Sequence, residues 1–310
     1  MQNPDFGARK ALSTRTLAAT LVLLGMGIIG FIDNFVSVIA ETASLWQFHF
    51  LRALMSLPLI MLAVGLGWGR LQVQRWRAVL PRSIVVAGAM FVYFGALGFM
   101  TIAQALAGLL SGPIFVLILG ALFLGQRFSV FQACAAALGF AGGLLVLQPT
   151  GNFLSPMLLW PILGGFLYAV GALLTRETCA EEETLTLLFC YVTAMAIGEA
   201  AGIAINWDSS ALAPDGSAGY LARAWGETPP EFWFWTAVQA VGSLVAVWCL
   251  TRAYQMAPAR LVSVLEYSLM VFGPLFAALL FAEIPNALAL MGLLLIMVSG
   301  FAMTYLEHDP

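Results

Sequence analysis

Charged side chains are scarce in this chain. Asp, Glu, Lys and Arg make up 9% of its 310 residues, whereas hydrophobic residues make up 61%. Soluble domains carry roughly 25% charged residues, so this composition excludes an ordinary soluble protein and predicts a polytopic membrane protein. Nothing in the net charge of -3 suggests a nucleic-acid partner.

Catalytic and metal-binding motifs are also lacking. The four cysteines show no CxxC spacing, and we interpret them as small apolar residues. Without GxxxxGK[ST] the chain has no nucleotide motor of its own, and without HExxH or GxSxG an intramembrane enzyme acting on a lipid-linked substrate is the weaker hypothesis. No charged ring or filter-like repeat favours a channel. We expect no metal and no cofactor.

Long apolar runs, in contrast, are abundant. A spanning helix needs about 20 apolar residues. Several breaks between runs carry a proline, among them Pro81 and Pro258, at or just before an expected helix start, where a missing N–H does least harm. The runs predict an all-α protein with ten transmembrane helices: 17–39, 45–67, 82–101, 103–124, 130–148, 156–176, 184–205, 232–253, 258–281 and 287–306.

The basic residues predict the orientation of these helices. With a cytoplasmic N-terminus, eleven of the thirteen basic residues fall in cytoplasmic segments, Arg52 falls within a helix and Arg223 falls outside. The positive-inside rule therefore predicts that both termini are cytoplasmic and that the protein lies in the plasma membrane, which is the inner membrane of a bacterium. The long external loop, 206–231, is expected to be a solvated connector. The eleven basic residues in the predicted cytoplasmic segments are Arg9, Lys10, Arg15, Arg70, Arg75, Arg77, Arg82, Arg127, Arg176, Arg252 and Arg260.

The sequence also shows signs of an internal duplication. A shift of 157 residues places 123–126 on 280–283 and 142–143 on 299–300, and a shift of 138 places Gly27 on Gly165. Two five-helix repeats, 1–150 and 151–310, would follow. Because five is odd, the second repeat would have inverted topology, as in many secondary transporters. Chance similarity between apolar segments is the competing explanation.

Several stretches resemble a known family. They are Trp46 to Arg52 (WQFHFLR), Gly112-Pro113, 124–127 (LGQR), 139–149 (GFAGGLLVLQP) and 281–283 (FAE). In these the chain resembles the drug/metabolite transporter superfamily, in its ten-helix EamA branch. It departs from the family at Gln126, where an acidic residue is usual, and in its long 206–231 loop. The resemblance implies a transporter but does not select a substrate, since relatives move amino acids, nucleotide-like compounds, vitamins and drugs.

Asp33 and Arg52 are ionisable residues in consecutive apolar helices. An ionisable group at membrane depth is costly and therefore suggests function. At 1.5 Å per residue, each lies roughly 10 Å inside the external end of its helix, so the two share a level. His49 shares a helical face with Arg52. Two roles remain open for Asp33 and Arg52: a site or gate for a polar substrate, or a salt bridge that ties the first two helices together.

Glu266 is a further ionisable residue within a predicted helix, and Tyr267 follows it. Glu266 is a candidate proton carrier; alternatively it pairs with Arg252 or Arg260. Glu199, in the outer third of its helix, either binds substrate or extends its carboxylate to the membrane surface, and we favour the second.

Two prolines are expected to bend their helices. Pro274 lacks an N–H and should free a carbonyl near Met270, and Pro113 implies a similar bend in the fourth helix. Kinked helices beside a central cavity suit alternating access, so both prolines are candidate gating residues.

The candidate site combines these residues with two aromatic ones. Tyr93 and Trp46 are expected to line the cavity and to stack on a planar or cationic group. The predicted function is secondary active transport of a small polar or zwitterionic organic metabolite by alternating access, through proton coupling or exchange. Expected partners are the substrate, membrane lipid and a coupling proton, with the chain as a monomer or homodimer. The predicted substrate-binding residues are Asp33, Trp46, His49, Arg52, Tyr93, Glu266 and Tyr267, and the gating or coupling residues are Asp33, Arg52, Glu266, Pro113 and Pro274.

Overall fold

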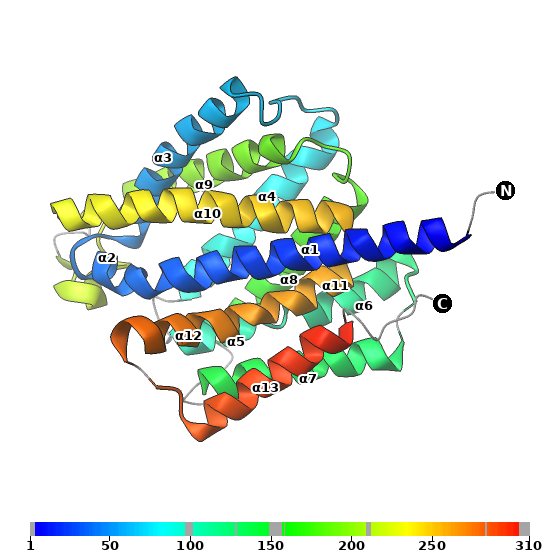
Figure 1. Ribbon diagram of the computed structural model, residues 1–310. Coiled ribbons are helices and arrows are strands. Elements are labelled where there is room, and N and C mark those ends of the chain that lie inside the picture. Colours follow the sequence, from blue (N-terminus) through cyan, green and yellow to red (C-terminus); the bar gives the residue numbers. More distant parts are fainter. Residues whose placement is uncertain are drawn as a thin grey trace.

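The computed structural model describes residues 4–96, 102–127, 129–148, 157, 159–208, 212–282 and 284–303. Every regular element in these ranges is helical (Figure 1). Within them, nine helical stretches are long and apolar enough to cross a membrane, and a tenth apolar helix, α13, has 15 residues. The expected all-α membrane fold is confirmed. The last predicted residues of the tenth helix, 304–306, lie outside the described ranges.

The helices follow one another in the predicted order. Their bounds are α1 Pro4–Ile32, α2 Val36–Thr42, α3 Leu45–Gly65, α4 Trp76–Ala96, α5 Ile102–Leu109, α6 Gly112–Leu124, α7 Val130–Leu147, α8 Leu159–Glu177, α9 Thr184–Asn206, α10 Pro230–Met256, α11 Ala259–Leu265, α12 Leu269–Phe281 and α13 Ala287–Phe301.

Three of the spanning helices are interrupted. The first passes from α1 into a 3-10 turn, η1 (Asp33–Phe35), before α2; the fourth is divided into α5 and α6; and the ninth is divided by η5 (Glu266–Ser268). Pro113 explains the second break, because it begins a new helix where its missing N–H costs nothing. The bend that Pro274 predicts near Met270 is displaced: the helix is interrupted at η5, and Pro274 lies inside α12. The break in the first helix was not expected.

Glycines allow the broken helices to pack closely. A Cβ on Gly30 would come within 2.9 Å of the Gly273 nitrogen, so α1 and α12 meet backbone to backbone. A Cβ on Gly142 would approach the Gly292 carbonyl oxygen at 2.7 Å, which holds α7 against α13 at one edge of the bundle (Figure 1). Small residues at helix contacts of this kind are typical of membrane bundles.

The segment between α9 and α10 is packed onto the protein, contrary to the expected solvated connector. Here the main-chain oxygen of Tyr220 accepts from the Leu45 nitrogen at 2.7 Å, and Ser44 donates to Ala224 at 2.9 Å. One terminal nitrogen of Arg223 donates to the carbonyls of Ala40, Ala43 and Gly216. This end of the bundle, with 212–229 folded over the α2–α3 connection, is called the loop end below (Figure 1).

The opposite end carries the connections 66–75 and 178–183. An exposed ion pair joins Arg75 to Glu181 at 3.1 Å, and Glu182 accepts from the backbone nitrogens of Gln74 and Arg75. The third helix begins here at Trp76 rather than at 82, so Pro81 lies inside α4 and the prediction that it marks the start was wrong. Arg82 is consequently inside the bundle.

Candidate functional site

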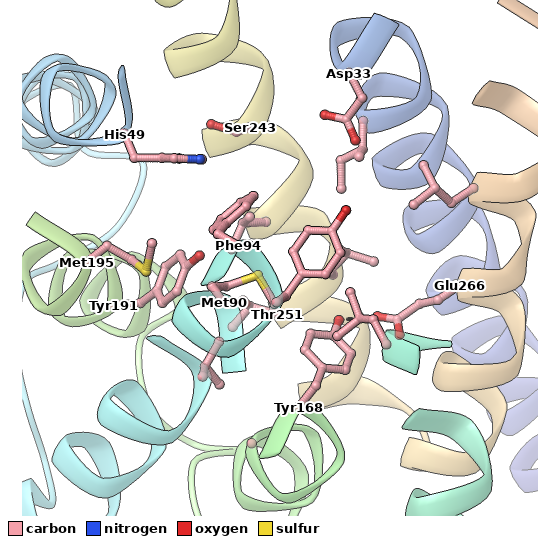
Figure 2. Close-up of a pocket in the computed structure, with 18 of the residues that line it drawn as sticks. Asp33, His49, Met90, Phe94, Tyr168, Tyr191, Met195, Ser243, Thr251 and Glu266 are labelled. Atoms are coloured by element: carbon pink, nitrogen blue, oxygen red, sulfur yellow. Dashed lines mark hydrogen bonds between the residues drawn. The ribbon is translucent and has the colours of Figure 1, made fainter. Parts of the chain in front are cut away.

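A cavity of about 360 Å³ lies between the helices and takes lining residues from α1, α3, α4, α8, α9 and α10 and from the breaks in the fourth and ninth helices. Figure 2 shows side chains of these elements converging on one space, among them Asp33, His49, Tyr168 and Glu266. Along α10 the lining extends from Gln239 to Tyr254. At 1.5 Å per residue the cavity therefore runs roughly 22 Å along the bundle.

Asp33 and Arg52 both face this cavity near the loop end. Asp33 sits in the η1 turn and its side chain is exposed to the cavity, whereas Arg52 on α3 is half-buried. Each lies in the electric field of the other, but no ion pair within 4.0 Å joins them. The Arg52 guanidinium lies 5.6 Å from the Phe48 ring centroid. Both charges thus remain open to the cavity.

Three further residues complete this polar region. His49 is buried, its ring lies 4.2 Å from that of Phe94, and its Nδ1 has no hydrogen-bond partner among the described residues. The Tyr220 hydroxyl, from the packed loop, is likewise buried without a described partner. Burial raises the pKa of this hydroxyl, so it stays protonated and able to donate. Tyr93 lines the same region, as expected.

Two predicted residues have other positions. Trp46 is not among the lining residues; its Nε1 donates to the Leu221 carbonyl at 3.0 Å and its ring packs on Gly202. Tyr267 borders the cavity but is fully buried, and its hydroxyl donates to the Leu110 carbonyl at 3.0 Å. It therefore ties η5 to the break between α5 and α6. Of the two prolines, Pro113 lines the cavity and Pro274 does not.

Glu266 forms part of a second polar region, toward the opposite end. The Tyr168 hydroxyl donates to its Oε1 at 2.6 Å (Figure 2). Tyr254 also lies close enough to interact with the carboxyl. Glu266 forms no ion pair with Arg252 or Arg260, each of which was an alternative partner. A buried carboxyl that accepts a hydrogen bond from a tyrosine can bind or release a proton without breaking a salt bridge.

Two ionisable groups were not assigned to the interior from the sequence. Arg82 is 4% exposed and lines the cavity. Glu199 is fully buried on α9, and neither carboxylate oxygen has a hydrogen-bond partner in the described chain, so the expectation that it reaches the membrane surface was wrong. Glu199 lies in the field of Arg52 but outside the cavity lining. Within the described ranges, no three His, Cys, Asp or Glu residues gather to hold a metal ion.

Comparison with known proteins shows that the first half of the chain is similar to one family. Residues 16–148 match the model of the EamA-like transporter family. A riboflavin transporter from Rhizobium johnstonii is 31% identical over 150 residues, which is 48% of this chain and 48% of the relative, so this match spans about half of each. A pseudopaline exporter from Pseudomonas aeruginosa is 25% identical over 73% of this chain and 74% of its own length.

A solved structure shares the fold. A crystal structure superposes with a TM-score of 0.75 at 18% sequence identity, over 95% of this chain and 97% of the other. That likeness extends beyond the stretch matched by the family model and covers both halves of the bundle. The apolar helices make the chain a multi-pass membrane protein, and the matches support a transporter of the EamA type in the drug/metabolite transporter superfamily rather than an enzyme.

Proposed function

We propose that this protein is a secondary active transporter that moves a small polar or zwitterionic organic metabolite across the bacterial inner membrane. The two halves, 1–150 and 151–310, would act as inverted repeats that alternately open the cavity to either side. Membrane lipid surrounds the bundle, and the transporter works as a monomer or homodimer. The observation that carries the proposal is the pair of opposite charges, Asp33 and Arg52, which face one cavity without pairing.

Matching helix ends support the two-repeat plan. α6 and α12 each end at a left-handed residue, Gly125 and Ala282, which are 157 positions apart. α7 and α13 are then capped by Ser129 and Asn286, again 157 apart, and both cap side chains accept from the backbone three residues on. The breaks in the fourth and ninth helices lie at equivalent places under the same spacing. Matched caps favour a duplication over chance similarity of apolar segments.

The charge distribution supports an orientation. Arg70, Arg75, Arg77 and Arg176 gather at the opposite end, whereas Arg223 belongs to the loop end. By the positive-inside rule the opposite end is cytoplasmic and the loop end faces outward. Asp33 and Arg52 then meet the cargo on the outer side of the membrane.

The polar groups of the cavity support a cargo with both charges. Asp33 would hold a cationic group and Arg52 an anionic one, because neither is neutralised by a protein ion pair. His49, Tyr220 and Tyr93 add hydrogen bonding and ring contact, and Glu266 would carry the coupling proton. The names of the relatives, a riboflavin transporter and a pseudopaline exporter, favour an organic molecule of metabolite size.

Replacing the two charges tests this function. A thermal-shift screen of metabolites on purified protein first selects a cargo, because a ligand that binds only the folded state stabilises it. Uptake of that compound into proteoliposomes is then expected to be lost in Asp33→Asn and Arg52→Ala, with unchanged size-exclusion profiles. Arg75→Ala, which removes a charge from an exposed surface pair, is the matched control and should transport normally. Normal uptake by both cavity variants would remove Asp33 and Arg52 from the site.

A further inference from the structure

Arg82 is a buried arginine that ties four helices together. From α4, its Nε donates to the Thr175 hydroxyl of α8 at 2.9 Å, one terminal nitrogen donates to the Leu187 carbonyl of α9 at 3.3 Å, and the other donates to the Thr251 hydroxyl of α10 at 3.3 Å. Thr175 in turn donates to the Gly171 carbonyl at 2.7 Å, which orients its oxygen toward the guanidinium.

All three acceptors of Arg82 are neutral. No carboxylate in the described ranges lies within ion-pair distance of the guanidinium, whereas the exposed Arg75 has Glu181 at 3.1 Å. The ionisable groups that interact most strongly with Arg82 are cysteines and tyrosines: Cys179, Tyr191, Tyr168 and Cys190. A buried cation is expensive unless an opposite charge compensates for it. A side chain that only joined these helices could be a neutral hydrogen-bond donor. The positive charge of Arg82 is therefore explained better by a bound anion.

The guanidinium is also within reach of a bound molecule. Arg82, Thr175 and Thr251 all line the cavity. A guanidinium has five N–H groups, and the three hydrogen bonds leave one on each terminal nitrogen. These two are the groups that form a forked contact with a carboxylate or phosphate.

This region lies farther along the cavity than Asp33. On α10, Gln239 donates to the Ile32 carbonyl, which is next to Asp33, and Thr251 accepts from Arg82. The distance between Gln239 and Thr251 along α10 therefore gives the separation of the Asp33 and Arg82 levels. Twelve residues at 1.5 Å each place the two levels roughly 18 Å apart. Asp33 and Arg82 therefore lie at different levels of the cavity.

From these contacts we infer that Arg82 is an anion subsite, which binds the carboxylate or phosphate of the cargo at the end of the cavity away from the loop. The inference rests on the proposed transport function and narrows its cargo to organic acids. Thr175 and Thr251 hold the guanidinium in position. The carboxylate or phosphate of the cargo supplies the negative charge that compensates for the buried guanidinium.

Matched acid and neutral probes test the subsite. Purified wild-type protein is titrated with riboflavin 5′-phosphate against riboflavin, and with glutarate against glutaramide, by thermal shift. The acid of at least one pair is expected to bind about tenfold or more tightly than its neutral partner, as a charge-assisted hydrogen bond would require. The phosphate and carboxylate pairs show which anion is preferred.

Variants then locate the preference. Arg82→Gln retains a donor for Thr175 and is expected to abolish the preference for the acid, so that the acid and neutral probes bind equally. Arg82→Lys keeps the charge and should restore part of the preference, which a purely structural role would not produce. Equal binding of acid and neutral probes by the wild-type protein would overturn the subsite, as would a preference that survives Arg82→Gln. If Arg52→Ala abolishes it instead, the anion binds at the loop end and the proposed transport function stands without this subsite.

Discussion

At the scale of single residues, several charged side chains of the cavity have no ion-pair partner among the described residues. Asp33 and Arg52 face it without an ion pair, and Arg82 has only neutral acceptors. Glu266 differs, because it is held by the Tyr168 hydroxyl rather than by a cation. Placing such groups within a bilayer costs free energy, so their presence suggests a function. The division of labour we propose is cargo binding by the three charged groups and proton exchange at Glu266.

Replacing Glu266 separates coupling from binding. Glu266→Gln keeps an acceptor for Tyr168 but cannot release a proton, so cargo exchange across proteoliposomes should continue at near the wild-type rate. Accumulation driven by an imposed pH gradient should be lost. Tyr168→Phe, which leaves the carboxyl ionisable and removes one hydrogen bond, is the comparison variant and should retain gradient-driven uptake with an altered pH profile. Gradient-driven accumulation by Glu266→Gln would assign coupling to another group.

The candidate residues that sequence alone could identify were those that interrupt long apolar runs: Asp33, Arg52 and Glu266. Arg82 was not predicted as a cavity residue because Pro81 suggested that the helix begins at 82, whereas α4 begins at Trp76. A proline is tolerated so early in a helix that it does not fix the first residue. Trp46 was placed in the cavity because nothing in the sequence shows that 212–229 folds back to bind it.

At the scale of helices, glycine positions decide which pairs can touch. Gly142 on α7 and Gly292 on α13 each face the other's carbonyl oxygen, and the ring of Tyr267 packs on Gly139. Small residues recur four apart at Ala135, Gly139 and Gly143, but the sequence does not show which helix packs on them. The ten apolar runs were likewise predictable from length, whereas the breaks at η1 and η5 were not, since each depends on packing between distant segments.

A valine at Gly142 should separate α7 from α13. Its Cβ would meet the Gly292 oxygen at 2.7 Å, and overpacking of this kind costs about 1–3 kcal/mol. We expect Gly142→Val to melt several degrees below wild type when thermal unfolding is followed by fluorescence-detected size exclusion. Gly88→Val is the matched control, because a Cβ on Gly88 meets nothing within 4 Å and the cost of a β-branched residue in a helix is the same. Equal melting of the two variants would show that this contact is not tight.

At the scale of the whole molecule, the two ends of the bundle differ in construction. The loop end is closed by 212–229, whose Arg223 binds three carbonyls, whereas the opposite end has short polar connections and an exposed ion pair. The cavity connects a polar region near each end. Transport by alternating access requires that these regions open in turn, and the interrupted helices η1 and η5 lie beside them.

The asymmetry of the ends predicts an orientation that labelling can check. In a variant lacking Cys134, Cys179, Cys190 and Cys249, single cysteines are introduced as Asp215→Cys at the loop end and Arg75→Cys at the opposite end, both exposed positions. A membrane-impermeant maleimide added to intact spheroplasts should label Asp215→Cys at once and Arg75→Cys only after permeabilisation, because basic segments stay cytoplasmic. The reverse labelling pattern would show that the loop end is cytoplasmic. Asp33 and Arg52 would then take cargo from the cytoplasm and the Arg82 subsite would face outward, so the labelling also decides which subsite the cargo meets first.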